Sequence, residues 1–255
     1  MTDTVLITGS TSGIGKALAV VFAQKQYNLV LVARNEERLK KQSHELGVTY
    51  GISVHTILCD LEKPGAADLV YQQFVDLNLQ IDILINNAGF NEYGPFLTTN
   101  IGNEIDMIHL HAIYPTEMMK LFLPAMVKNK KGRILNVGST GSFMSCPKDA
   151  VYAATKSYIL SVSKAIGSEL KGTGVTITTL CPGSTRTKFA EKAGMEDTLL
   201  FKLFVMQPEK VARIGYRALM QGKSTVIAGT YNKLLVVSSY LLPNYFINQL
   251  TKKML

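Results

Sequence analysis

Short apolar stretches alternate with longer segments of helical periodicity along most of the chain. The apolar stretches predict strands at residues 4–9, 28–33, 53–59, 81–89, 132–139, 174–183 and 224–229. Between them, helical spacing predicts helices at 13–26, 35–46, 64–77, 98–127, 150–171 and 208–221. Because strands and helices alternate, the pattern predicts an α/β fold, a parallel sheet with helices on both faces.

Two segments interrupt this alternation. Residues 184–207 follow the sixth predicted strand, and residues 231–255 follow the last one. No linker rich in Pro, Gly or Ser, no low-complexity segment and no internal repeat divides the chain. We therefore expect one domain over residues 1–230, which includes the segment 184–207, and a tail over residues 231–255.

The composition is that of a slightly apolar globular protein, with 47% hydrophobic and 18% charged residues. No apolar run approaches the roughly 18–20 residues of a membrane span. The first residues lead at once into a predicted strand, so we expect no signal peptide. The cysteines (Cys59, Cys146 and Cys181) are far apart and lack metal-type spacing. These features predict a cytoplasmic protein without a metal site.

The net charge of +8 suits nucleic acid, a membrane surface or an anionic ligand. No basic run is interleaved with aromatic residues, which argues against nucleic acid. An anionic cofactor or a lipid surface is therefore the favoured partner.

The stretch "LITGSTSGIGKAL" places Gly9, Gly13 and Gly15 between the first predicted strand and the first predicted helix. Glycines at such a junction allow a tight turn and let a pyrophosphate approach the helix N-terminus, where free N–H groups favour anions. The spacing is GxxxGxG rather than GxGxxG, and many glycine-rich turns bind nothing. Its position at the first strand–helix junction favours a dinucleotide site.

Arg34 stands at the end of the second predicted strand, in "LVLVARNEERL". In dinucleotide-binding folds, an acid at this place accepts a hydrogen bond from the adenosine ribose, whereas an arginine accommodates a 2′-phosphate. Arg34 therefore indicates NADP(H) in preference to NAD(H). The alternative is an ordinary solvated arginine.

Tyr152 and Lys156 in "VYAATK" are four residues apart and thus lie on one face of a predicted helix. A neighbouring ammonium lowers the pKa of a phenol towards working pH, which makes it an acid–base catalyst. Ser139, in "NVGSTGS", ends the fifth predicted strand and is placed to hydrogen-bond a substrate carbonyl. Taken singly, the tyrosine–lysine spacing is common by chance, and a serine at a strand end is usually a cap.

The combination is far more specific. The glycine turn, "NNAG" at 86–89, Ser139, the tyrosine–lysine pair and "PGSTRT" at 182–187 follow one another in the order found in the short-chain dehydrogenase/reductase family, which the chain resembles over roughly residues 4–229. The resemblance implies one Rossmann-type domain, with a doubly wound parallel sheet of about seven strands. It also implies NAD(P)-dependent hydride transfer between an alcohol and a ketone, and a homodimer or homotetramer.

The same resemblance assigns roles. Ser139 corresponds to the serine that orients the substrate and Tyr152 to the proton donor. Lys156 corresponds to the lysine that lowers the tyrosine pKa and holds the nicotinamide ribose. The expected cofactor contacts are Gly9, Ser12, Gly13, Ile14, Gly15 and Arg34, then Asp60 and Leu61 beside the adenine, then Asn87, Ala88 and Gly89, and finally Pro182, Gly183 and Thr187, together with Tyr152 and Lys156.

His111 departs from the family pattern. Many members carry an asparagine in this helix, upstream of a Leu-Pro pair that here is 123–124, and the asparagine is thought to hold a water that relays protons to the lysine. On an α-helix His109 and His111 project about 200° apart, so we expect a surface His109 and a half-buried His111 that share no metal. An imidazole can also relay protons. The alternative is that His111 simply packs.

The segment 184–207 corresponds to a mobile lid over the substrate in the family, although a core helix is the simpler alternative. Together with Phe143 and Met144 beyond Ser139, it favours a lipophilic substrate: a 3-oxoacyl, sterol-like or other apolar carbonyl compound. The apolar residues of this segment are Met195, Leu199, Leu200, Phe201, Leu203, Phe204, Val205 and Met206.

The tail 231–255 contains no acidic residue and includes Lys233, Lys252 and Lys253. Three arrangements remain open: a helix at a membrane surface, a helix docked on a partner subunit, or packing on its own domain.

The rival to an enzyme is a catalytically quiet NADP(H)-binding protein that regulates or scaffolds a partner. The replaced asparagine is its one support, and the intact Ser139, Tyr152 and Lys156 argue against it.

Overall fold

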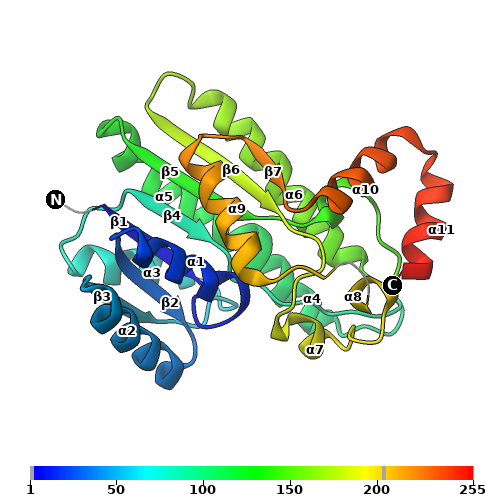
Figure 1. Ribbon diagram of the computed structural model, residues 1–255, viewed down its shortest axis with the longest axis horizontal. Coiled ribbons are helices and arrows are strands. Elements are labelled where there is room, and N and C mark those ends of the chain that lie inside the picture. Colours follow the sequence, from blue (N-terminus) through cyan, green and yellow to red (C-terminus); the bar gives the residue numbers. More distant parts are fainter. Residues whose placement is uncertain (1–2, 203–204, 255) are drawn as a thin grey trace.

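A sheet of seven parallel strands forms the centre of the molecule. The computed structural model describes residues 3–202 and 205–254, and its strand order is β3-β2-β1-β4-β5-β6-β7 (Figure 1). The predicted doubly wound, Rossmann-type fold is thereby confirmed. The strands are β1 (Thr4–Thr8), β2 (Asn28–Ala33), β3 (Val54–Leu58), β4 (Ile83–Asn86), β5 (Gly132–Val137), β6 (Val175–Cys181) and β7 (Thr225–Ile227).

The apolar patterning of strands and helices explains the three layers. Successive residues of β1 alternate between the two cores, with Leu6 in one and Val5 and Ile7 in the other. Helices α3 (Ala66–Asp76), α5 (Tyr114–Lys128) and α6 (Ala150–Glu169) supply the first core. Helices α1 (Gly13–Gln24), α2 (Glu36–Tyr50) and α9 (Pro208–Met220) supply the second.

The strand order reverses between β1 and β4, which is where open α/β sheets bind ligands. Strands β4, β5 and β6 end two or three residues before the ends of the apolar stretches that predicted them. The residues beyond Asn86, Val137 and Cys181 leave the sheet at its carboxyl edge, and three of the sequence motifs lie there.

The predicted helix 98–127 is in fact interrupted. Helix α4 (Ile101–Ile108) is followed by a π-helical turn, His109–Ile113, before α5 begins. The Tyr114 N–H bonds to the carbonyl of His109, five residues back. Pro115 has no N–H to continue the α-helical ladder, so the chain widens at this point. The expected angle between His109 and His111 assumed an α-helix, and residues 109–113 form a π-helical turn instead.

The two irregular segments lie at one end of the sheet. The predicted lid contains the short helices α7 (Lys188–Ala193) and α8 (Leu199–Lys202); Leu203 and Phe204 lie outside the described residues. The tail forms α10 (Thr230–Leu241) and α11 (Asn244–Met254), which extend beyond β7 and α6 in Figure 1. Within the described part of the chain, no helix has the length and apolar character that a membrane span requires.

Candidate active site

The glycine turn forms a cradle at the start of α1. Gly9 and Gly13 have φ of 63° and 53°, in the region that favours glycine. A Cβ on Gly9 would lie 2.8 Å from Ala88 Cα, and one on Gly15 would overlap the Gly9 carbonyl oxygen. Ser12 precedes α1 without capping it, and the first turn has no acidic residue. The free N–H groups therefore suit a pyrophosphate, so the residues fit a dinucleotide.

Asn87 fastens this cradle to the end of β4. Its Nδ2 donates to the carbonyl oxygens of Thr8, at 2.9 Å, and of Gly9, at 3.2 Å. The hydroxyl of Thr8 accepts from the N–H groups of Asn87 and Ala88. The "NNAG" segment thus lies against the glycine turn.

Arg34 lies at the expected strand end but is paired. Its guanidinium is 2.6 Å from a carboxylate oxygen of Glu62 and 3.9 Å from one of Asp60. The Arg34 side chain is about half exposed. Glu62, which the sequence motifs did not single out, therefore competes with any phosphate for this arginine.

The predicted catalytic residues converge at the carboxyl edge of β5. Tyr152 and Lys156 lie on α6, and the Lys156 Nζ is 5.5 Å from the centre of the Tyr152 ring. Ser139 follows β5, and its Oγ accepts from the Gly141 N–H. The Lys156 Nζ donates to the Val137 carbonyl at 3.2 Å. The structure thus brings together three residues that are up to 17 positions apart in the sequence.

Burial is the main influence on the protonation of Tyr152 and Lys156. It raises the pKa of Tyr152, the nearby Asp149 carboxylate raises it further, and a hydrogen bond with Ser139 acts in the opposite direction. Burial also lowers the pKa of Lys156 to about 8. The expected lowering of the Tyr152 pKa by Lys156 is therefore wrong for this structure, because burial raises that pKa instead. At neutral pH the phenol carries its proton, as a proton donor must.

His111 is fully buried, at 3% exposed, so the prediction of a half-buried side chain is wrong. Its Nε2 accepts from the Phe90 N–H at 3.3 Å, and its Nδ1 lies 3.1 Å from the Thr155 hydroxyl. Thr155 donates to the Tyr152 carbonyl at 2.8 Å, which leaves its oxygen to accept from the Nδ1 proton. Burial, aided by the Lys156 charge, keeps the pKa of His111 well below its usual value, so the ring is neutral.

The position of the His111 ring also explains why residue 89 is a glycine. A Cβ on Gly89 would lie 2.6 Å from the His111 Nε2. The last residue of "NNAG" must therefore be small because the ring occupies the space beside it. The π-helical turn and this close approach together place His111 between the "NNAG" segment and the catalytic helix.

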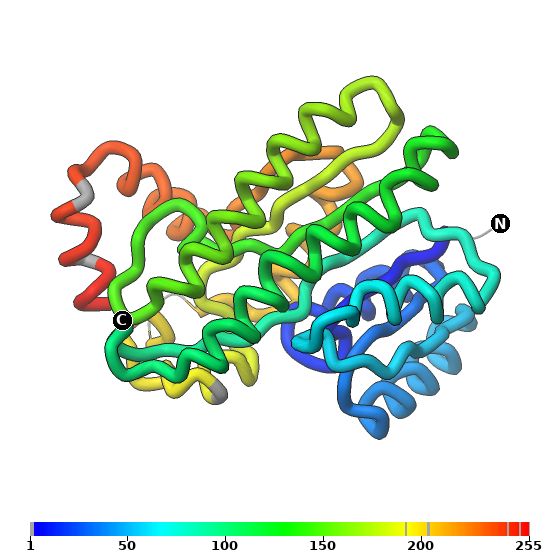
Figure 2. The backbone as a smooth tube through the Cα atoms, turned by 180° about the vertical axis from the view of Figure 1, so that it is seen from behind, coloured from blue at the N-terminus to red at the C-terminus, as the bar shows by residue number. Residues whose placement is uncertain are grey.

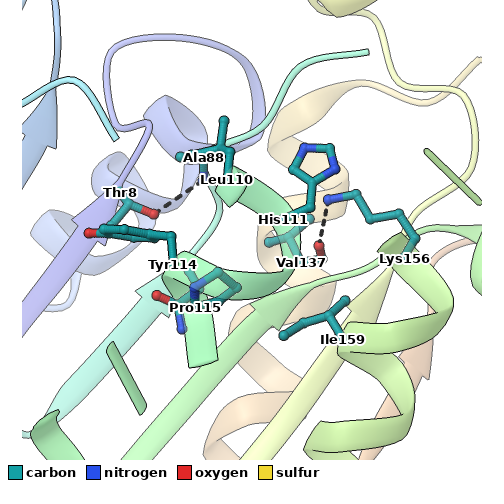
Figure 3. A pocket seen from close by; sticks show the side chains of 10 residues that line it. Thr8, Ala88, Leu110, His111, Tyr114, Pro115, Val137, Lys156 and Ile159 are labelled. Carbon is teal, nitrogen blue, oxygen red and sulfur yellow. Dashed lines mark hydrogen bonds between the residues drawn. The ribbon is translucent and has the colours of Figure 1, made fainter. Parts of the chain in front are cut away.

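A small cavity lies below His111 and Lys156. Its volume is about 10 Å³, close to the smallest space that holds one water. Figure 3 shows the His111 ring beside the Lys156 amino group, with Tyr114 on the opposite side. Two buried polar atoms of the lining, Tyr114 Oη and Asn86 Oδ1, have no hydrogen-bond partner among the described residues. Such atoms normally bind an ordered water.

Asp149 and Asn91 are site residues that the sequence reasoning missed. Both are buried, and Asn91 Nδ2 donates to the Asp149 carboxylate at 2.8 Å. Burial raises the pKa of Asp149 to about 7. The positions held a signal: Asp149 immediately precedes α6, three residues before Tyr152, and Asn91 closely follows "NNAG".

The segment 184–207, the predicted lid, lies on this side of the site. The ring of Phe189, in α7, lies 5.7 Å from the Tyr152 ring, and the Met195 sulfur lies 3.2 Å from Asn91 Nδ2. Thr187 lies against Gly13, where an added Cβ would be 3.0 Å from its methyl group. The glycine turn and the "PGSTRT" segment, which are the first and last parts of the predicted cofactor site along the chain, therefore lie side by side.

Known proteins resemble this chain. It matches the family model for short chain dehydrogenase over residues 3–197. It is 29% identical over 256 residues to dehydrogenase/reductase SDR family member 7B of Xenopus laevis, covering 96% of this chain and 79% of that protein. It is 36% identical over 191 residues to granaticin polyketide synthase putative ketoacyl reductase 1 of Streptomyces violaceoruber, covering 73% of this chain and 69% of that protein.

The fold is also similar to solved structures. A short-chain dehydrogenase from Sphingobium yanoikuyae in complex with NADPH superposes with a TM-score of 0.83 at 28% identity, covering 94% of each chain. Structures of similar fold also include a complex with NAD. The fold by itself therefore does not choose between the two cofactors.

Proposed function

Since the chain belongs to the short-chain dehydrogenase family and is an oxidoreductase of that family, we propose that it interconverts a ketone and a secondary alcohol with NADP(H). One observation carries the proposal: Ser139, Tyr152 and Lys156 meet at the carboxyl edge of β5, next to the glycine cradle. This arrangement unites a proton donor, a hydrogen-bonding serine and a cation beside an anion-binding helix end.

Each of these residues has a defined task. In ketone reduction Tyr152 donates its phenolic proton to the carbonyl oxygen, which Ser139 orients by a hydrogen bond. Lys156 holds the nicotinamide ribose, and its positive charge favours the phenolate that remains. The glycine cradle and the N-terminus of α1 hold the pyrophosphate. The nicotinamide, when bound, supplies or accepts the hydride.

The preference for NADP(H) over NAD(H) rests on Arg34. A cation at the end of β2 suits a 2′-phosphate, and no acid replaces it there. Its ion pair with Glu62 weakens this preference, because the phosphate must share the guanidinium with a carboxylate. We therefore propose a preference that Glu62 moderates.

A lipophilic substrate is supported by the surroundings of Tyr152. Phe189 and Met195 of the lid cover the tyrosine side of the site. Apolar side chains gain free energy by burying an apolar ligand, whereas they leave a charged one without partners. We propose a 3-oxoacyl, sterol-like or other apolar carbonyl compound.

The role proposed for His111 is to support proton transfer near Lys156. Its two ring nitrogens both have partners, and burial keeps the ring neutral. A direct relay through the ring requires these hydrogen bonds to rearrange. The adjoining cavity, with room for about one water, supports a relay by water next to the ring.

The proposed homo-oligomer has a suitable surface. Ile108 of α4 and Tyr158 of α6 are exposed apolar side chains that line a shallow depression of about 430 Å³. Figure 2 shows these helices running across the back of the molecule. Light scattering decides whether the chain is a homodimer or homotetramer.

The deciding experiment is NADPH oxidation with a panel of ketones, aldehydes and 3-oxoacyl thioesters. We expect turnover that rises with the apolar surface of the carbonyl compound and that a Tyr152→Phe variant lacks. Cofactor binding without turnover across the panel would favour the rival, a catalytically quiet NADP(H)-binding protein.

A further inference from the structure

The tail has two faces, and only one of them packs on the domain. The buried side chains are Asn232 and Val236 of α10 and Ile247 and Thr251 of α11, each pair one helical turn apart. Asn232 lies against Gly183, where an added Cβ would be 2.6 Å from the Asn232 Cγ. Packing of the tail on its own domain, one of the three arrangements that the sequence left open, therefore accounts for one face of the tail only.

The opposite face exposes large apolar side chains. Leu234, Val237 and Leu241 form one stripe along α10, with spacings of three and four residues. Tyr245 and Phe246 extend it around the turn into α11, and Tyr240 borders it: this side chain is 69% exposed, although its ring also contacts that of Phe143. Leu241 is 77% exposed and Phe246 is 58% exposed, whereas the outer face of a surface helix is normally polar. These six residues are called the tail face below.

Positive charge borders the tail face. Lys252 and Lys253 follow Tyr245 and Phe246 by seven residues each, so they lie on the same side of α11 two turns away. Lys233 is exposed at the start of α10. Residues 230–255 contain no acidic side chain. The surface thus combines apolar side chains, tyrosines and lysines in the way that membrane-surface helices do.

We propose that the tail face docks on an anionic lipid bilayer, with its apolar side chains among the acyl chains and its lysines at the headgroups. Charge complementarity favours this occupant over a second copy of the chain. A symmetric contact of two tail faces would bring lysines towards lysines with no acid from either tail to pair them. Tyrosine and lysine also suit the headgroup layer, because each has an apolar body and a polar end.

Docking of the tail face on a bilayer would also affect access to the active site, because of where the tail lies. Helix α11 contacts α8 of the lid, and both lie at the same end of the molecule (Figure 1). Docking would therefore present the lid side to the bilayer. If the lipophilic substrate proposed above is correct, it would reach the site from the membrane. The docking itself does not depend on that substrate.

Vesicle flotation tests the proposal. The probes are vesicles of phosphatidylcholine and phosphatidylserine in a three-to-one mixture, and vesicles of phosphatidylcholine alone. We expect the full chain to bind the anionic vesicles more tightly, and to release as salt screens the lysines. Neither the cofactor nor turnover enters the measurement, so its outcome is separate from that of the proposed function.

Two double variants separate the apolar from the charged contribution. Leu241→Gln with Phe246→Gln should weaken binding to both kinds of vesicle by more than about tenfold. Lys252→Gln with Lys253→Gln should weaken binding to the anionic vesicles by about fivefold per lysine and leave neutral vesicles unaffected. The matched control is Val48→Gln with Leu69→Gln, two exposed apolar residues on α2 and α3 at the far end of the molecule.

Two flotation results would overturn the proposal. One is a wild-type chain that does not float with the anionic vesicles. The other is a variant with Leu241→Gln and Phe246→Gln that floats as well as the control. A fall in mass by light scattering for the same variant, without any change in flotation, would also overturn it, because that result assigns the face to a partner subunit. Since the substituted side chains are exposed, the unfolding midpoint should not move, which verifies that each variant is folded. Removal of residues 231–255 is a poorer test, because it also uncovers the core beneath Val236 and Ile247.

Discussion

The ring of His111 meets the ring of Tyr152 edge-on, with centroids 5.7 Å apart and an interplanar angle of 77°. The same imidazole bonds to the Phe90 N–H on one side and the Thr155 hydroxyl on the other. The candidate proton donor is therefore positioned in part by a residue that joins the "NNAG" segment to the catalytic helix. His111 and Tyr152 should consequently be coupled in kinetics as well as in space.

Substitution of His111 tests this coupling. His111→Asn should retain activity, because an amide can accept from Phe90 and hold a water. His111→Leu should lower kcat by about 10–100-fold with little change in KM, since the residue is not expected to touch substrate. Because burial lowers the His111 pKa, any imidazole limb in the wild-type kcat profile should lie below pH 6.5 and be absent from the Asn variant. A folded Leu variant with wild-type kcat would reduce His111 to a packing residue.

Substitution of Tyr152 and Lys156 tests the mechanism. Tyr152→Phe should abolish ketone reduction and leave NADPH binding nearly intact, because only the phenolic hydroxyl is lost. Lys156→Ala should impair both, since the lysine is proposed to hold the ribose as well. Tyr158→Phe is the matched control: it lies on the same helix, but its hydroxyl faces Thr116 at 3.0 Å. Appreciable turnover by the Tyr152→Phe variant would refute the assigned role.

Calorimetry with both cofactors tests Arg34 and Glu62. Arg34→Ala should weaken NADPH binding by about 10–100-fold, the value of a charge-assisted hydrogen bond, and leave NADH nearly unchanged. Glu62→Gln should strengthen NADPH binding, because it releases the guanidinium from its 2.6 Å ion pair. Arg213→Ala, an exposed arginine on α9, controls for the loss of net charge. Equal affinities of the wild type for both cofactors would remove Arg34 from its proposed role.

Asp149→Asn should change both stability and the pH profile. The folded pKa of about 7 exceeds the ordinary value of 3.8, so the folded state holds the proton more tightly than the unfolded state does. The resulting stability is complete below pH 3.8 and is lost as pH rises through about 7. At pH 8 the Asn variant should therefore unfold with a free energy about 1–3 kcal/mol higher than the wild type, whereas the two should be similar at pH 4.

The same variant should affect the tyrosine. Because the Asp149 carboxylate raises the pKa of Tyr152, its removal should shift the limb on which alcohol oxidation rises with pH to lower pH. Asp68→Asn, an exposed acid in the first turn of α3, should change neither property. Chemical denaturation at the two pH values and a pH–rate profile provide the measurements. An unmoved limb would exclude electrostatic coupling between Asp149 and Tyr152.

The sequence by itself determined the sheet, its helices and the main motif positions. These features are encoded locally: apolar alternation specifies buried strands, helical spacing specifies the covering helices, and the four-residue separation of Tyr152 and Lys156 puts both on one face of α6. The glycines of the first turn are likewise a local requirement, because the backbone at Gly9 and Gly13 has positive φ values that favour glycine. No distant residue is needed to predict any of them.

Only the tertiary structure decided how the site residues are paired and charged. His111 is neutral because the fold buries it near the charge of Lys156, 45 positions away, and its ring nitrogens bond to residues 21 and 44 positions away. Asp149 is buried beside Asn91, which is 58 positions away. Arg34 meets Glu62 across 28 positions. Desolvation and hydrogen bonding depend on which groups the fold brings within a few ångströms, and the periodicity of one segment contains no information on its distant neighbours.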